Sequence, residues 1–108
     1  MKTESRIQQD CMIWYRNNHL NTNNIFASIP NEGKNAIEQM RKKATGMYAG
    51  FSDTIVIHFG KIVFIEFKDE KGRQSDKQKD FESKILANGF KYHICRSLEE
   101  FINIIQTI

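Results

Sequence analysis

The sequence predicts an α/β domain in which a mixed β-sheet is flanked by helices on both faces, in the order α-β-α-β-β-α-β-α. Three observations support this prediction. Apolar residues recur at helical spacing in four segments, and β-branched and aromatic residues gather in four short runs. Two of those runs follow each other directly, as the strands of an antiparallel hairpin do. Residues 1–108 are assigned to a single domain, because this length is usual for one core and no linker interrupts the chain.

The first half of the chain contains two predicted helices and one short strand. Residues 3–18 form a helix whose apolar residues share one stripe: Ile7, Cys11, Trp14 and Tyr15. The stretch "LNTNN" ends this helix, and "IFASI" then forms a strand that stops before Pro30. Residues 34–44 form a second helix, closed by Gly46.

The second half begins with the hairpin "DTIVIHFGKIVFIEFK", whose tight turn we place at Gly60-Lys61. Ser75 and Gln78 then form a capping box that opens a third helix, which ends at Gly89. Its expected inner face holds Phe81, Ile85 and Leu86. The strand "FKYHIC" follows, and a second capping box, Ser97 with Glu100, opens the last helix. Its expected inner residues are Leu98, Phe101, Ile102 and Ile105.

Composition describes an ordinary globular chain with a modest net charge of +3. No apolar run approaches the roughly 20 residues that a membrane helix needs, and "MKTESRIQQD" lacks the apolar region of a signal peptide. We therefore expect a cytoplasmic protein with no membrane partner. Cys11 and Cys95 have no metal-binding spacing, so we expect buried free thiols.

The segment "FIEFK" places two charges in an apolar strand. Glu66 and Lys68 are two residues apart and therefore share one face of the strand, opposite Val63, Ile65 and Phe67. An edge strand with a solvated ion pair would explain them. The hairpin, however, roughly mirrors Asp53 onto Lys68 and so brings it to the same end, after two glycines that let the backbone bend. Two carboxylates converging from adjacent strands favour a hard oxygen site for Mg²⁺ or Mn²⁺.

The pattern D-x12-E-x-K after a Gly-rich turn resembles the PD-(D/E)xK nuclease superfamily. The segments "SIPNEGKN", "GMYAGFSD", "FIEFKDEKGRQSDKQKDF" and "LANGFKYHICRSLEEF" are together similar to the VRR-NUC family, in its compact stand-alone form known from phages and bacteria. The resemblance covers nearly the whole chain and implies a restriction-endonuclease-like core. In one departure, Ser52 occupies the place of the family's usual Pro before the Asp. Proline there would stiffen the turn but has no chemical role.

The resemblance implies a role for each matching residue. Asp53 and Glu66 would bind the metal with the backbone carbonyl of Phe67, and Glu4 is a further candidate ligand. Lys68 would be the catalytic lysine, and Gln78 would belong to the active site. Asn31 and Glu32 match the family's PNEG segment and would approach it.

Structural roles remain open for the same residues. Asp53 would also suit the start of a strand, Lys68 would neutralise Glu66, and Gln78 would complete the capping box. Glu4 lies on the inward stripe of its helix, but an acidic residue in a first turn also suits the helix dipole. Asn31 and Glu32 would suit a turn after Pro30. No role is assigned to His19, His58 or His93.

The expected function is a metal-dependent DNA endonuclease with no organic cofactor, acting on branched DNA such as four-way junctions as a homodimer. Seven basic residues are candidate phosphate contacts, although solvated surface charges would look the same: Arg41, Lys42, Lys43, Lys71, Arg73, Lys77 and Lys79. The alternatives are a less selective nuclease of the same superfamily, cutting flaps, duplex ends or restriction sites, and a non-catalytic DNA-binding or assembly module. RNA as the substrate is not excluded.

Overall fold

The computed structural model describes residues 1–19, 22–31 and 34–108 and confirms the predicted order of elements. The helices and strands are α1 (Glu4–His19), β1 (Ile25–Ser28), α2 (Ala36–Ala44), β2 (Thr54–His58), β3 (Lys61–Phe67), α3 (Asp76–Ala87), β4 (Lys91–Cys95) and α4 (Leu98–Thr107). The predicted break at "LNTNN" falls partly on residues outside the described ranges. Within those ranges, no helix is long and apolar enough to cross a membrane.

The four strands form one mixed sheet in the order β1-β2-β3-β4. The pairs β1–β2 and β2–β3 are antiparallel, whereas β3 and β4 run parallel and are joined through α3. A parallel neighbour requires such a crossover, because the chain must return to the same end of the sheet. β3 therefore lies between two strands, and the edge-strand explanation of Glu66 and Lys68 is wrong.

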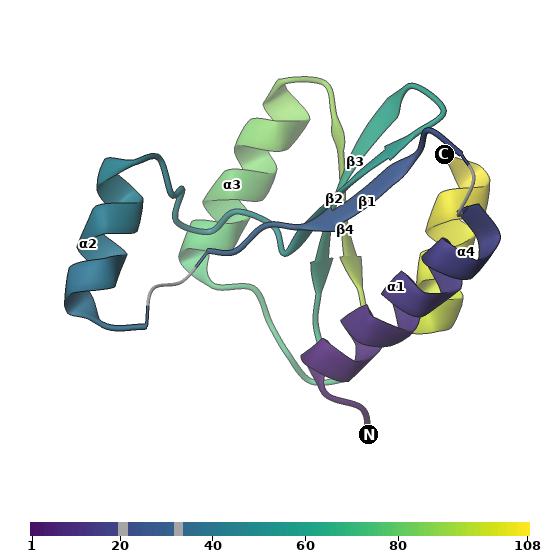
Figure 1. The fold of residues 1–108 in the computed structure, drawn as a ribbon, viewed down its shortest axis with the longest axis horizontal. Helices are drawn as coiled ribbons and strands as arrows, with labels where there is room; N and C mark the ends of the chain where they lie inside the picture. The colour runs from purple at the N-terminus through teal and green to yellow at the C-terminus, as the bar shows by residue number, and fades with distance from the viewer. Residues whose placement is uncertain (20–21, 32–33) are drawn as a thin grey trace.

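Helices cover both faces of the sheet, as predicted (Figure 1). α1 and α4 lie on one face, over a core that includes Val63, Ile65, Phe67 and the fully buried Phe101. α3 lies on the other face, where Phe81 packs on Phe64 and Tyr92. Each fully buried large apolar side chain contributes about 1.5–3 kcal/mol relative to exposure. Cys11 and Cys95 are free and buried, as expected.

The hairpin turn differs from the prediction by one residue. Its two central residues are Phe59 and Gly60, both with positive φ (48° and 81°), and Lys61 already belongs to β3. A two-residue turn with positive φ at both positions matches the twist of the strands, which explains why the turn forms at Phe59-Gly60. The Asn24 side chain also accepts a hydrogen bond from the Phe59 N–H at 2.8 Å. This register pairs Thr54 with Ile65. Its continuation brings Asp53 opposite Glu66 and not opposite Lys68.

The helices show three smaller corrections. Leu86 is 54% exposed, so the inner face of α3 is formed by Phe81 and the half-buried Ile85. In α4, Ile104 is buried, whereas Ile102 is only partly buried. The Ser97 hydroxyl caps the Glu100 N–H as predicted, but the Glu100 carboxylate accepts from the Arg96 N–H one residue earlier.

α2 stands apart from the rest of the fold (Figure 1). It begins after Asn35, whose side chain accepts a hydrogen bond from the Glu38 N–H at 2.9 Å. None of its nine residues, all of which the structure describes, is buried. Its apolar Ile37 and Met40 are 66% and 71% exposed. The helix is therefore held by its cap and its local ion pair rather than by a core.

Gly50 fixes the segment before Asp53 against the start of α3, and its replacement tests that contact. A Cβ at Gly50 would lie 2.2 Å from the Lys77 carbonyl oxygen, and φ is +82°. Gly50→Ala should cost about 3 kcal/mol or more, from overpacking added to backbone strain. At Gly46, φ is +110° but no atom lies within 4 Å of such a Cβ, so Gly46→Ala should cost only about 1 kcal/mol. Urea unfolding measures both, and equal costs would contradict the contact.

Candidate active site

Asp53 lies at the entrance to β2 and is fixed by bonds on both sides. Its carbonyl accepts a hydrogen bond from the Ile29 N–H at 2.8 Å, and its Oδ2 accepts from the Phe67 N–H at 2.7 Å. The fully buried Ser52 donates from its hydroxyl to the Thr54 carbonyl at 2.9 Å, bridging across Asp53. This hydrogen bond restrains the turn where the family usually has Pro. The carboxylate of Asp53 therefore sits directly at the end of β3.

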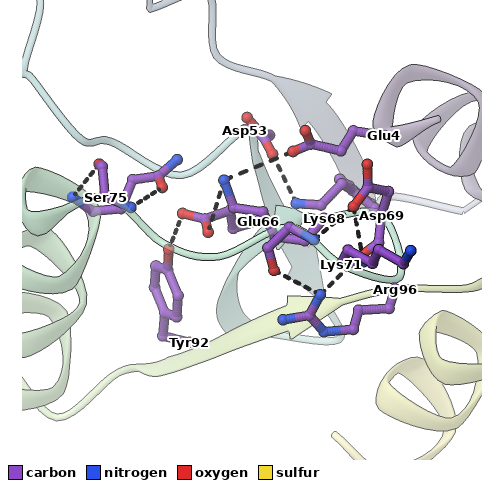
Figure 2. Close-up of polar contacts among 12 residues, drawn as sticks. Glu4, Asp53, Glu66, Lys68, Asp69, Lys71, Ser75, Tyr92 and Arg96 are labelled. Carbon is purple, nitrogen blue, oxygen red and sulfur yellow. Dashed lines mark hydrogen bonds and ion pairs between the residues drawn. The ribbon is translucent and has the colours of Figure 1, made fainter.

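Glu66 is a fully buried carboxylate in the central strand. The Tyr92 hydroxyl donates to its Oε1 at 2.5 Å (Figure 2). Its other oxygen, Oε2, is buried without a hydrogen-bond partner among the described residues. The Lys68 ammonium lies 3.8 Å from Oε2. An unsatisfied oxygen on a buried carboxylate is costly, so this atom needs a further partner to be stable as an anion.

Lys68 lies between two carboxylates. Its Nζ is 3.8 Å from Glu66 Oε2 and 3.7 Å from Glu4 Oε1, and its side chain is only 11% exposed (Figure 2). Both distances exceed those of a charge-assisted hydrogen bond, so the ammonium is attracted to both groups without being locked to either. Glu4, in contrast, is 47% exposed. The expectation that its carboxylate points into the core is wrong, because it sits in the first, solvated turn of α1.

Burial raises the pKa of Glu66 above its ordinary value of 4.5. The hydrogen bond from Tyr92 and the charge of Lys68 lower this pKa, whereas the nearby charge of Asp53 raises it again. Loss of hydration is the largest of these effects, so the protein alone does not fully stabilise the anion. The pKa of the Tyr92 hydroxyl is also raised, first by its burial and then by the Glu66 carboxylate. Tyr92 therefore remains a proton donor at neutral pH.

The donors at this position fit a hard divalent cation. Asp53 and Glu66 supply carboxylate oxygens from adjacent strands, and Glu66 Oε2 lacks a hydrogen bond in the described structure. The described residues contain no cluster of three acidic, histidine or cysteine side chains that could hold a metal. Glu4 is thus joined to the site through Lys68 and not as a third member of a carboxylate cluster. The Phe67 carbonyl as a ligand stays a prediction.

The other predicted site residues are less closely tied to these groups. Gln78 completes the capping box, with its Oε1 accepting from the Ser75 N–H at 2.8 Å. Its role in the active site remains a prediction. Asn31 is partly buried after Pro30, and Glu32 lies outside the described residues. Of the histidines, His58 is buried at the far end of the hairpin and bonded to the Tyr15 hydroxyl at 2.9 Å.

The seven candidate DNA contacts fall into two groups. Arg41, Lys42 and Lys43 lie in the last turn of the outlying α2, where Lys42 pairs with Glu38 at 3.1 Å. The other four, Lys71, Arg73, Lys77 and Lys79, follow the site on the loop after β3 and on the first turn of α3, and all four are exposed. Of the two groups, the second lies nearer to Lys68 along the chain.

Two residues that sequence reasoning missed shape this site. Tyr92 was read only as part of a strand, yet the parallel register sets it opposite Phe64, two residues before the partner of Glu66. Arg96 donates through Nη1 to the carbonyls of Asp69 and Gly72 at 2.6 and 2.8 Å, and so fixes the loop that follows Lys68 (Figure 2). Neither contact has a local sequence signal, because each joins segments more than 20 positions apart.

Comparison with known proteins agrees with this geometry. The family model of the VRR-NUC domain matches residues 2–99, and the chain belongs to this family. Membership implies a nuclease-type domain that acts on DNA. Among curated proteins none matches the sequence.

Solved structures share this fold. One, described as a VRR_NUC domain protein, is 19% identical, with a TM-score of 0.78 over 99% of this chain and 88% of that chain. Another, described as a VRR_NUC domain, is 18% identical, with a TM-score of 0.64 over 98% and 97% of the two chains. At these identities the likeness establishes the architecture, a mixed sheet between helices, as predicted.

The raised pKa of Glu66 predicts how stability depends on pH in the absence of metal. Because the folded state holds this proton more tightly than the unfolded state, stability should fall as pH rises from 4.5 through the raised pKa. Glu66→Gln removes this loss, so its stability relative to wild type should grow by up to about 1.4 kcal/mol per pH unit in that window. Urea unfolding in EDTA between pH 4.5 and 8 measures it. Glu99→Gln, at an exposed position, is the control, and a constant difference for Glu66→Gln would contradict the prediction.

Proposed function

We propose that this chain is a metal-dependent DNA endonuclease that hydrolyses phosphodiester bonds with Mg²⁺ or Mn²⁺. The observation that best supports the proposal is the buried Glu66 carboxylate, with one oxygen lacking a hydrogen bond in the described structure, beside Asp53 and Lys68. A core carboxylate that is left under-stabilised by its own protein is expected where a cation completes the site. Family membership supports the nuclease part of this proposal.

The residues divide the chemistry between them. Asp53 and Glu66 would hold the ion, together with the Phe67 carbonyl. When bound, a divalent cation polarises the scissile phosphate and lowers the pKa of the attacking water. Lys68 positions that water or offsets the negative charge that develops on the phosphate. Gln78 orients one of these groups, and Glu4 assists through a second ion or a water.

Branched DNA is the substrate that we infer, with a homodimer as the acting form. Resolving a four-way junction requires two cuts, and two copies of a compact domain supply two sites with paired geometry. Phosphates would be held by the exposed basic residues that follow the site, among them Lys71 and Arg73. The buried residues of α4, Phe101, Ile104 and Ile105, pack in the core of the same protomer. The dimer proposal therefore rests on the need for two sites rather than on an apolar helix left over for a partner.

A less selective nuclease, cutting flaps, duplex ends or restriction sites, uses the same chemistry. A non-catalytic DNA-binding module is the alternative of a different class, and RNA as the substrate is also open. The buried Glu66 argues against a module without chemistry, because a binding surface has no need of an unsatisfied carboxylate in its core.

Cleavage of a labelled four-way junction beside a linear duplex of the same sequence tests the proposal. With Mg²⁺ or Mn²⁺ the wild type should cut the junction symmetrically. EDTA should abolish cutting, and so should Glu66→Gln, which removes a ligand charge. Cutting of both substrates would retain the chemistry and reject the junction preference. Absence of cutting with either metal, in protein that binds DNA, would reject the nuclease. Light scattering on the same sample reports whether the active form is a dimer.

Lys68→Met separates chemistry from binding. The variant should lose about 10²–10³-fold in turnover, the usual effect of removing a group that stabilises developing charge. Its affinity for DNA, measured by gel shift in Ca²⁺, should change little. Lys61→Met removes an exposed lysine from the other end of the same strand and is the matched control. Equal losses of turnover and binding in Lys68→Met would assign Lys68 to substrate binding instead.

A further inference from the structure

The Tyr92 side chain is held in one place by its surroundings. It is 7% exposed, its ring lies 6.1 Å from that of Phe81, and its strand pairs with β3 in parallel. Tyr92 lies opposite Phe64, and Ile94 lies opposite Glu66. The long aromatic side chain therefore leans along the strand to reach the carboxylate two residues further on. A ring packed in this way has little freedom to follow the carboxylate if it moves.

The hydrogen bond from Tyr92 distinguishes the two oxygens of Glu66. Oε1 accepts the hydroxyl at 2.5 Å, whereas Oε2 has no hydrogen-bond partner among the described residues and lies toward Lys68 (Figure 2). The terminal torsion of a glutamate has broad minima, so an unrestrained carboxylate would rotate. A donor fixed on one oxygen also fixes the direction in which the other oxygen points.

We propose that Tyr92 is a positioning residue that holds Glu66 Oε1 so that Oε2 is presented to a divalent cation. The inference rests on the proposed function, in which Glu66 is a metal ligand. Tyr92 itself touches neither the ion nor the DNA in this arrangement. Outer hydrogen bonds of this kind orient ligands, and their loss typically weakens metal binding by about 10–100-fold.

A purely structural role makes a different prediction. If Tyr92 only satisfies a buried carboxylate, its hydroxyl stabilises the protein to the same extent with and without metal, and the affinity for metal does not depend on it. If Tyr92 orients the ligand, its loss reduces the stabilisation that metal provides. Metal affinity therefore separates the two roles, and no DNA is required to measure it.

The experiment is a titration of the metal-free protein with Mn²⁺ by calorimetry, comparing wild type with Tyr92→Phe. Tyr48→Phe is the matched control. It also removes a hydroxyl that takes part in a hydrogen bond, here from Lys84 at 2.7 Å, but on the exposed side of α3. Tyr92→Phe should raise the dissociation constant for Mn²⁺ about 10-fold or more. Adding Mn²⁺ should also raise the melting temperature of this variant less than that of the wild type. Tyr48→Phe should bind as the wild type does.

Each result has one meaning. If wild type binds Mn²⁺ through Glu66, as its loss in Glu66→Gln would show, and Tyr92→Phe binds equally well, the inference about Tyr92 is overturned while the proposed metal site stands. If wild type does not bind Mn²⁺, the proposed function fails, and the inference fails with it.

A measurement on the wild type covers the case in which Tyr92→Phe does not fold. In protein labelled with ¹³C at the tyrosine Cζ, titration with diamagnetic Mg²⁺ should shift the Tyr92 resonance and leave that of Tyr48 unchanged. The Cζ resonance is sensitive to the hydrogen bond of the hydroxyl, which tightens or loosens as Glu66 engages the ion. A Tyr92 resonance that does not respond, at Mg²⁺ concentrations that saturate the protein, would overturn the inference.

Discussion

The burial of the Glu66 carboxylate is the constraint around which the site is built. Removing an ionised carboxylate from water costs several kcal/mol even in a relaxed protein. The hydrogen bond from Tyr92 offsets about 1.5–3 kcal/mol of that cost, and Lys68 contributes at a distance too long for a direct hydrogen bond. The remaining imbalance is expressed as the raised pKa of Glu66. The site therefore holds more negative charge than its own donors neutralise.

The position of β3 explains how such a residue is tolerated. Its neighbours on both sides complete the backbone hydrogen bonds, so only the side chains decide what each face contains. One face supplies Val63, Ile65 and Phe67 to the core under α1 and α4, and the other places Phe64 and Glu66 under α3. Asp53 enters from the antiparallel neighbour and Tyr92 from the parallel one. Two different pairings thus meet at a single carboxylate.

The sequence was a good guide where the signal is local. Helical periodicity, the Ser75 capping box and the hairpin run predicted every element in order, and the same-face spacing of Glu66 and Lys68 placed the two charges together. It failed at the hairpin turn and where distant segments meet. The position of the turn depended on a positive φ at Phe59, which the sequence does not indicate for a residue other than glycine. The edge-strand explanation failed because the order of the strands in the sheet cannot be read from any single segment of the sequence. Tyr92 was missed for the same reason, since its contact with Glu66 depends on which strand lies beside β3.

The connection between β1 and β2 is long for two neighbouring antiparallel strands. These strands are antiparallel neighbours, which a few residues suffice to connect, yet the chain makes a long excursion through α2. Since α2 buries no residue, its opening costs the core little, and it belongs to the least protected part of the native ensemble. Amide hydrogens there should exchange with solvent long before those of β3. The end of the same connection differs from α2, because Gly50 and Ser52 are held against the rest of the fold.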